Sequence, residues 1–317
     1  MGAISAHYAK ATLPVCNRPL IALHLASLAS LGIRHVVVVV GHRAESVIRT
    51  ATAHKPDGVH VDFVEQKQRL GIADALFRAE PQVRGQNLVV ILGDTHFIAD
   101  NLAAGLGPLS AGARAPAAVL SVRRVRDPEM IRRECTVRLD DHGNLVEIRE
   151  KPRTPFNDLK PCGIYFFSPA IFDAIDMTPA SPLRGEVEIT DAIQTLVSTG
   201  QTVGSAHTVA WDRNINYPGD ILLSNLVELD RRHLVRLMGR NVALHREAVV
   251  DHSVVGNDVS VSSPARIIRS LVLDGAVVDQ HGDFVDCVVG PGFAVPDCLD
   301  AEWADTPDGF SLAQPRP

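Results

Sequence analysis

The stretch His35-Val36-Val37-Val38-Val39-Val40-Gly41 is an unbroken run of valines that ends at a glycine. β-Branched side chains favour strands, and a continuous apolar run is typical of a strand that is buried on both faces of a sheet. Residues 19–31 before this run and residues 44–54 after it carry apolar side chains at helical spacing. A buried strand between two helices indicates an α/β domain.

The same alternation continues along the chain as far as about residue 236. It predicts a Rossmann-like, mainly parallel sheet with right-handed crossovers. A hairpin is expected around the turn at residues 140–143. The further strands are expected at 59–65, 87–92, 117–123, 162–167 and 203–209, and the further helices at 72–79, 189–198 and 218–236.

Beyond residue 238 the apolar residues follow a six-residue period, which is typical of a left-handed, hexapeptide-repeat β-helix. An array of hairpins with chance spacing is the alternative. We therefore expect three parts, at 1–238, 239–299 and a loose tail at 300–317. The period is carried by two series, Val255, Val261, Ile267 and Leu273, and Val259, Ala265, Leu271 and Val277.

Composition and net charge limit the kinds of partner and the cellular compartment that we expect for this protein. A net charge of −6 over 317 residues argues against nucleic acid as the main partner, because phosphate backbones need clustered cations. The longest aliphatic run, residues 36–40, is too short to cross a membrane. Five scattered cysteines without a C-x-x-C motif argue against structural zinc and indicate a reducing cytoplasm.

Polar residues follow the predicted strands at their carboxyl ends, where ligands bind in open α/β sheets. Asp94 comes directly after Gly93 and has the hard oxygens that Mg²⁺ prefers, although it is equally compatible with a solvated helix cap. Gln66 ends the strand before it and can pair with a nucleobase edge. Gly71 opens the next helix and permits close approach of a ring or phosphate.

These segments together resemble the sugar-1-phosphate nucleotidyltransferases, or NDP-sugar pyrophosphorylases, which include glucose-1-phosphate thymidylyltransferases and mannose-1-phosphate guanylyltransferases. The resemblance covers residues 1 to about 235 and rests on the order and spacing of seven segments. They are Lys10-Ala11-Thr12-Leu13-Pro14-Val15, Glu65-Gln66, Leu92-Gly93-Asp94, Glu150-Lys151-Pro152, Cys162-Gly163-Ile164-Tyr165, residues 184–191 with Glu188-Ile189-Thr190-Asp191, and residues 211–220 with Trp211-Asp212-Arg213-Asn214.

The resemblance implies that a sugar 1-phosphate attacks a nucleoside triphosphate, which gives NDP-sugar and pyrophosphate. We expect a cytoplasmic homo-oligomer. Lys10 would offset phosphate charge, and Gln66, Gly71 and Gly93 would bind the nucleotide. Mg²⁺ would be held by Asp94 and by Asn214 or Asp212, of which Asn214 aligns better with the family's metal position. The sugar phosphate would be bound by Glu150, Lys151, Gly163 and Glu188.

The family also has a first strand and a G-G-x-G-T-R loop about ten residues before the lysine. Counting back from Lys10 places Met1 just after that loop. We expect either a protein that is longer than the given sequence or a homologue that has lost catalysis. The chain as written is expected to have little or no activity. The alternative function is therefore a non-catalytic nucleotide-sugar-binding regulator or scaffold.

Overall fold

The computed structural model describes residues 1–182, 185–299, 305–307 and 310, and these fall into two compact units. Unit 1 contains residues 1–23 and 213–317, and unit 2 contains residues 24–212. Most of the predicted tail at 300–317 lies outside the described residues. Among the helices that the structure does describe, none has the length and apolar character needed to span a membrane.

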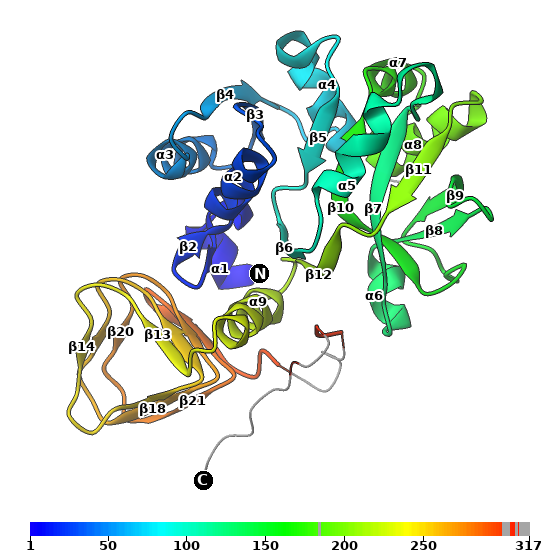
Figure 1. Cartoon of the computed structure of the whole chain (residues 1–317). Helices are drawn as coiled ribbons and strands as arrows, with labels where there is room; N and C mark the ends of the chain where they lie inside the picture. The colour runs from blue at the N-terminus through cyan, green and yellow to red at the C-terminus, as the bar shows by residue number, and fades with distance from the viewer. Residues whose placement is uncertain (183–184, 300–304, 308–309, 311–317) are drawn as a thin grey trace. The chain divides into compact units, whose positions relative to one another are not determined.

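Unit 2 is built on a four-stranded sheet with the order β11-β7-β10-β5 (Figure 1). Strand β11 runs parallel to β7, whereas β10 runs antiparallel to both β7 and β5. Three of the four strands, β5, β7 and β11, therefore run in one direction, as a mainly parallel sheet predicts, and β10 is the reversed strand that returns beside β7 after the β8–β9 hairpin. The bounds are β5 (Leu88–Ile91), β7 (Ala118–Arg124), β8 (Cys135–Leu139), β9 (Leu145–Glu150), β10 (Leu159–Phe167) and β11 (Val203–Ala206).

The valine run forms β3 (His35–Val40), which pairs in parallel with β4 (His60–Glu65) as a separate two-stranded sheet. Helices α2 (Leu20–Ser30) and α3 (Ala44–His54) flank β3 in sequence, as predicted. Residues 37–39 are only half-buried, which corrects the expectation of a strand buried on both faces. Within the described residues β3 has β4 as its one strand neighbour, and this leaves its valines partly open to solvent.

Helices pack on both faces of the four-stranded sheet. On one face Leu76, Ile171 and Ile193 join Phe167 in a large apolar core. On the other face Phe166 packs so closely on Gly105 that an added Cβ there would lie 2.1 Å from its ring. The remaining elements are α4 (Ile72–Val83), β6 (Thr95–Ala99), α5 (Ala103–Leu106), η2 (Gly107–Ser110), η3 (Gly112–Arg114), α6 (Pro128–Arg133), α7 (Ala170–Asp176), α8 (Ile189–Ser198) and β12 (Val209–Asn214), which pairs with β6.

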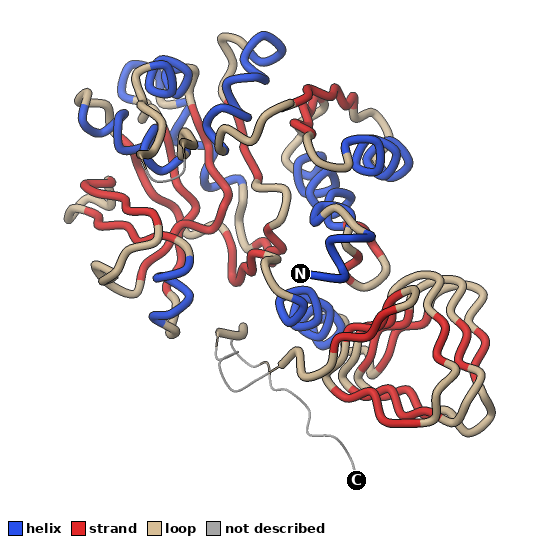
Figure 2. The backbone as a smooth tube through the Cα atoms, turned by 180° about the vertical axis from the view of Figure 1, so that it is seen from behind, coloured by secondary structure: helices blue, strands red, loops and turns tan. Residues whose placement is uncertain are grey.

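The C-terminal part of unit 1 is a β-helix whose three parallel ladders form the sides of a triangular coil (Figure 2). Facing residues such as Ser253 and Ser270 are 17 apart, close to three six-residue repeats. The predicted series is buried except for Val277, which is 60% exposed. The ladders comprise β13 (Arg236–Met238), β16 (Ser253–Val255), β19 (Leu271–Val272) and β22 (Val288–Gly290); β14 (Ala243–Leu244), β17 (Ser260–Val261) and β20 (Val277–Val278); and β15 (Val249–Asp251), β18 (Ala265–Ile268) and β21 (Gly282–Val285), with β23 (Phe293–Val295) antiparallel to β22.

The first residues of the chain pack onto this β-helix. Leu13 and Leu20 share one apolar cluster with Ile221 of α9 and with Val254 and Leu271 of the coil. The two compact units therefore differ from the domains predicted from the sequence. The domain boundary between residues 238 and 239 stays a prediction. The elements involved are α1 (Gly2–His7), η1 (Lys10–Thr12), β1 (Pro14–Val15), β2 (Arg18–Pro19) and α9 (Pro218–Arg231).

Candidate active site

The candidate site begins at the turn between β5 and β6, which carries Gly93 and Asp94. The Thr95 N–H donates to Leu92 O at 3.2 Å and closes this turn, while the Leu92 N–H donates to Gly163 O at 2.9 Å. Gly163 has φ +68°, and a Cβ there would lie 2.8 Å from Thr95 Oγ1. The structure thus brings Gly163 beside Asp94's turn, and both the space and the backbone conformation require glycine.

Gln66 and Gly71, the residues expected at the base, also meet. The Gln66 side-chain amide donates to Gly71 O at 3.0 Å and to Asp74 Oδ2 at 2.8 Å. Because both partners are acceptors, they fix the –NH₂ end of the amide toward α4. The amide oxygen of Gln66 therefore faces away from α4. Arg78 binds the second oxygen of Asp74 at 3.2 Å and holds that carboxylate in place.

The segment before α8 lies against the start of α4. The Val187 N–H donates to Leu70 O at 2.7 Å, and the Ala73 N–H donates to Val187 O at 3.1 Å. Gly71 has φ +102°, and a Cβ on it would lie 2.3 Å from Val187 O. This backbone pairing brings Glu188, the buried N-cap residue of α8, to the neighbourhood of Gly71. A predicted sugar-phosphate residue and a predicted nucleotide residue thus lie on adjoining segments.

Glu150 is the last residue of β9, and Lys151 follows it. Glu150 is paired in register with the buried Cys135 of β8. Lys151 has φ +41° and donates its N–H to Glu134 O at 2.7 Å, so the backbone turns sharply here. Its Nζ lies 3.9 Å from a Glu150 carboxylate oxygen, and its side chain is 54% exposed. An exposed, positively charged side chain at this position is available to an anionic ligand.

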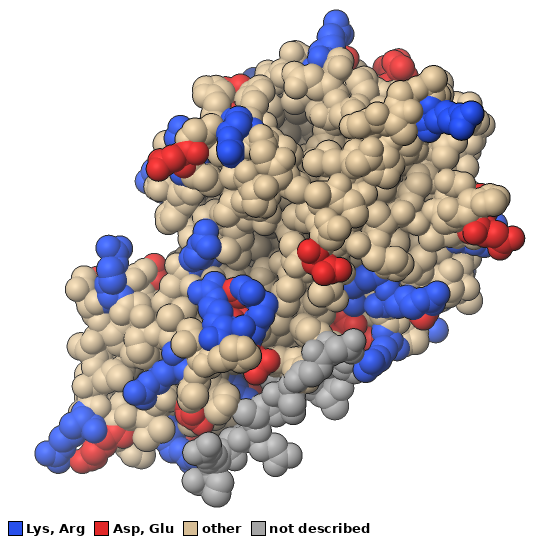
Figure 3. Space-filling model, viewed as in Figure 1, with Lys and Arg blue, Asp and Glu red and all other residues tan. Residues whose placement is uncertain are grey.

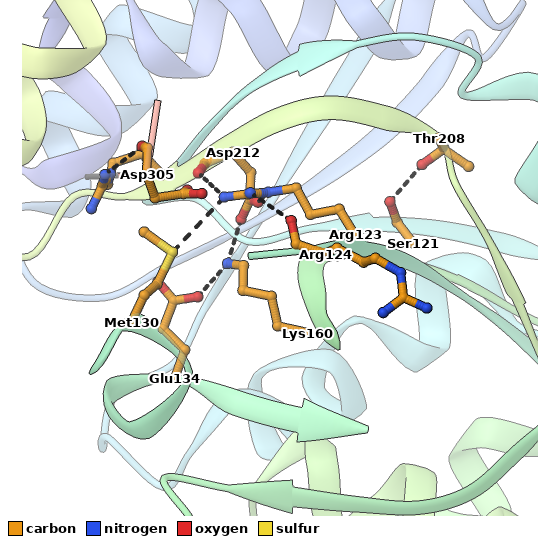
Figure 4. A network of polar contacts seen from close by, with 10 residues as sticks. Ser121, Arg123, Arg124, Met130, Glu134, Lys160, Thr208, Asp212 and Asp305 are labelled. Atoms are coloured by element: carbon orange, nitrogen blue, oxygen red, sulfur yellow. Dashed lines mark hydrogen bonds and ion pairs between the residues drawn. The ribbon is translucent and has the colours of Figure 1, made fainter. Parts of the chain in front are cut away.

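Asp212, one of the two candidates for a metal ligand, lies in a buried ionic cluster (Figure 4). Arg123 of β7 and Lys160 of β10 stand directly opposite each other in the sheet, an arrangement that would be repulsive alone. Asp212 from β12 binds both: Lys160 Nζ is 2.7 Å from Oδ2, and Arg123 Nε donates to Oδ1. Glu134 also accepts from Lys160. The positive charges of Arg123 and Lys160 are therefore balanced by the carboxylates of Asp212 and Glu134 within unit 2.

The cluster favours the charged forms of Asp212 and Lys160. Burial opposes ionisation of Asp212, but Lys160 and Arg123 outweigh it and hold the pKa of that carboxyl below its usual value. Burial likewise works against the Lys160 charge, and Asp212 with Glu134 raises the pKa of this lysine despite it. A carboxylate so engaged by two fixed cations has less capacity to coordinate a metal ion.

In unit 1, Lys10 reaches the segment that follows Asn214. Its Nζ donates to Asn216 Oδ1 at 2.7 Å. The Asn216 N–H donates to Asn214 O at 3.0 Å and to Asp220 Oδ2 at 2.8 Å. Asp220 thus holds the turn at the start of α9 as part of a capping box. Lys10 and the half-buried Asn214 belong to unit 1, and the other predicted site residues belong to unit 2.

Sequence reasoning missed several residues that position this site. Asp74 carries a weak signal, because an acidic residue in the first helical turn is usually attributed to the helix dipole. Lys160 and Arg123 sit in strands where alternation alone predicts a solvated face. Their role is shown only by their buried positions opposite each other in the sheet and by the contacts of both side chains with Asp212. The face of the protein in Figure 3 shows Lys and Arg as single residues or small groups, several of them beside Asp or Glu.

The sequence of the chain is similar to those of known proteins. The sequence model of the nucleotidyl transferase family matches residues 2–214. The chain is 32% identical over 290 residues to a glucose-1-phosphate thymidylyltransferase of Streptomyces antibioticus, across 91% of this chain and 77% of that protein. It is 33% identical to the UTP–glucose-1-phosphate uridylyltransferase AglF of Haloferax volcanii, across 67% of this chain and 84% of that protein.

The fold has solved counterparts. A UDP-glucose pyrophosphorylase complexed with UDP-glucose superposes with a TM-score of 0.62 at 19% identity, covering 73% of this chain and 94% of that one. This likeness shows the fold, and the family match and the sequence identities show the kinship. The chain therefore belongs to the nucleotidyl transferase family.

Proposed function

We propose that this protein transfers a nucleotidyl group from a nucleoside triphosphate to a sugar 1-phosphate. An oxygen of the sugar phosphate attacks the α-phosphorus, the bond to the β-phosphate breaks, and pyrophosphate leaves. The observation that carries the proposal is the convergence of Gln66, Gly71 and the segment before Glu188 in unit 2. The match of the chain to the nucleotidyl transferase family supports the same reaction. Such a site acts by alignment and by neutralising phosphate charge.

Mg²⁺ fits the donors that the chain offers. A half-buried carboxylate at Asp94 and an amide oxygen at Asn214 are the hard ligands that this ion prefers. When bound, Mg²⁺ would draw negative charge from the phosphates. We favour Asn214 over Asp212, because the Asp212 carboxylate already binds Lys160 and Arg123. Lys10 and Lys151 would add positive charge for the two substrates.

The substrate base is proposed to be a pyrimidine. The two relatives named above are a thymidylyltransferase and a uridylyltransferase, and both names specify glucose 1-phosphate. Thymine and uracil present an N–H donor between two carbonyl oxygens. Asp74 holds the amide nitrogen of Gln66, which leaves the oxygen of this side chain to accept from such a donor.

The test is pyrophosphate release from matched reactions that contain Mg²⁺, glucose 1-phosphate and one of dTTP, UTP, CTP, GTP or ATP. Turnover by this chain is expected to be weak, and the proposal predicts that it is higher with dTTP or UTP than with the purine nucleotides. Asp94→Asn and Lys151→Ala should abolish or sharply reduce it, and the surface variant Arg84→Ala should not. Calorimetric binding of nucleotide sugars without turnover would instead support the non-catalytic regulator.

We further propose a cytoplasmic homo-oligomer. The five cysteines, all free and buried, suit a reducing compartment. The β-helix has exposed apolar side chains at Leu244, Val249 and Val277 that are suited to contact with another subunit.

A further inference from the structure

A second group of chemically active side chains lies at the beginning of β3 and β4, away from the residues used above. His35 is the first residue of β3 and His60 the first of β4, and the two are direct partners in the parallel register. Asp62 stands two residues after His60 and therefore on the same face of the strand. These positions lie at the amino ends of the strands, whereas Gln66 follows the carboxyl end of β4.

The three side chains converge. The Nε2 atom of His35 lies 2.8 Å from Asp62 Oδ2, and the Nε2 atom of His60 lies 3.0 Å from Asp62 Oδ1. One ligand atom from each residue falls within 4.8 Å of the other two. The imidazole rings lie 5.7 Å apart, centre to centre. A simple His–Asp ion pair needs one histidine, and here two imidazoles from neighbouring strands turn to a single carboxylate.

We infer that His35, His60 and Asp62 form a binding site for a divalent transition-metal ion, with Zn²⁺ as the reference ion. Two imidazole nitrogens and one carboxylate oxygen are ligands that Zn²⁺, Co²⁺ and Ni²⁺ accept and that Mg²⁺ does not favour. Tetrahedral coordination at normal bond lengths separates ligand atoms by roughly 3.3 Å. The ligand atoms of the three residues already lie within 4.8 Å of one another, so side-chain rotation can bring them to that spacing. Three protein ligands leave a position for water.

The backbone makes this group well ordered before any ion binds. The β3–β4 ladder runs from His35 opposite His60 to Val40 opposite Glu65, and the His60 N–H donates to Arg34 O at 2.7 Å just before it. Ligands on paired strands cost little ordering entropy on binding. His60 is 70% exposed, and His35 and Asp62 are each 41% exposed, so an ion can enter from solvent. The bound ion would clamp the start of β3 to the start of β4.

The test is titration of the full chain, prepared without a histidine tag, with ZnCl₂ by calorimetry in millimolar Mg²⁺. We expect one equivalent to bind, and Co²⁺ to give visible absorption bands of a nitrogen- and oxygen-ligated ion. His35→Ala, His60→Ala and Asp62→Asn should each weaken this binding by at least about tenfold. His142→Ala, an exposed histidine in the β8–β9 turn, is the matched control and should bind as the parent does.

A second readout is thermal. An ion that binds only the folded chain raises the melting temperature by mass action, and the three variants should lose this rise while keeping the melting temperature of the metal-free parent. Retention of the site in all three variants would overturn the inference. The absence of binding to the parent chain at about 0.1 mM Zn²⁺ would also overturn it, because this concentration is far above the dissociation constants of preformed Zn²⁺ sites.

Discussion

Gln66 shows how one side chain is oriented for its proposed ligand. Asp74 and Gly71 O hold its nitrogen. Gln66→Glu would place a carboxylate oxygen against the Asp74 carboxylate and Gly71 O, which are both acceptors, so we expect the KM for dTTP or UTP to rise by more than tenfold. Asp74→Ala removes only the support, and we expect a rise of about three- to tenfold with kcat changed less. Steady-state kinetics measure both, and equal effects on purine and pyrimidine nucleotides would contradict the assigned role.

His24 is a buried residue whose charge state couples folding to pH. Burial lowers the pKa of its imidazole to about 4, although its bond to Thr95 O at 2.7 Å and the charge of Asp94 act in the opposite direction. Between about pH 4 and the unfolded value of roughly 6.5, the unfolded chain therefore binds a proton that the folded chain does not. This contribution to stability is present above pH 6.5 and is lost as pH falls toward 4.

The expected size of the effect is about 3 kcal/mol over that window, if the unfolded value is ordinary. His24→Gln keeps a donor for Thr95 O and cannot titrate. The urea midpoint of this variant should fall less than that of the parent between pH 7.5 and pH 4.5. Parallel pH profiles for the two chains would show that His24 does not couple protonation to folding.

At the scale of elements, the ionic cluster ties β12 to β7 and β10. Asp212→Asn would leave Lys160 and Arg123 facing each other in the sheet with Glu134 as the remaining carboxylate. Removing one member of a buried ion group costs roughly 3–5 kcal/mol, so the urea midpoint should fall strongly even without Mg²⁺. Asp158→Asn breaks the exposed pair with Arg124 and should cost less than about 1 kcal/mol.

This comparison also separates the two candidate metal ligands. Asn214→Ala should raise the Mg²⁺ concentration needed for turnover with little change in stability. If Asp212→Asn leaves stability unchanged and alters only the Mg²⁺ dependence, the assignment favoured above is wrong.

Local patterns predicted most elements but not how they pair. Helix α3 begins and ends at the predicted residues, and so does α8, because apolar spacing and caps are local signals. The antiparallel placement of β10 was not predictable, since its continuous apolar run fits either direction. Lys160 lies just before the apolar run at 162–167, and its partners Glu134 and Asp212 are 26 and 52 residues away in the sequence.

At the scale of the whole molecule, the sequence predicts Gln66, Gly71 and Asp94 as site residues because they belong to short motifs. It did not predict Asp74 as the support of Gln66, because that role depends on a side-chain contact between a strand end and a helix. Nor did it predict that residues 1–23 pack with the β-helix, because that contact joins the two ends of the chain. Contacts of this kind are set by tertiary packing, which periodicity does not encode.

This packing decides how the proposed oligomer should be tested. Deleting the β-helix would strip Val254, Leu271 and Val288 from the cluster that holds Leu13 and α9, so the truncated chain would lose core as well as any interface. A point substitution avoids that loss. Val277 is 60% exposed on the β14–β17–β20 ladder, and Val277→Glu should leave the coil folded.

We expect the parent chain to sediment as an oligomer, and Val277→Glu to shift it toward the monomer, because a buried carboxylate at a subunit contact is strongly unfavourable. Val146→Glu is the matched control, since Val146 is an exposed valine of β9 in unit 2, outside the β-helix. Sedimentation velocity over a range of concentrations measures the shift. An oligomer that survives Val277→Glu and dissociates with Val146→Glu would move the interface from the β-helix to the β8–β9 hairpin.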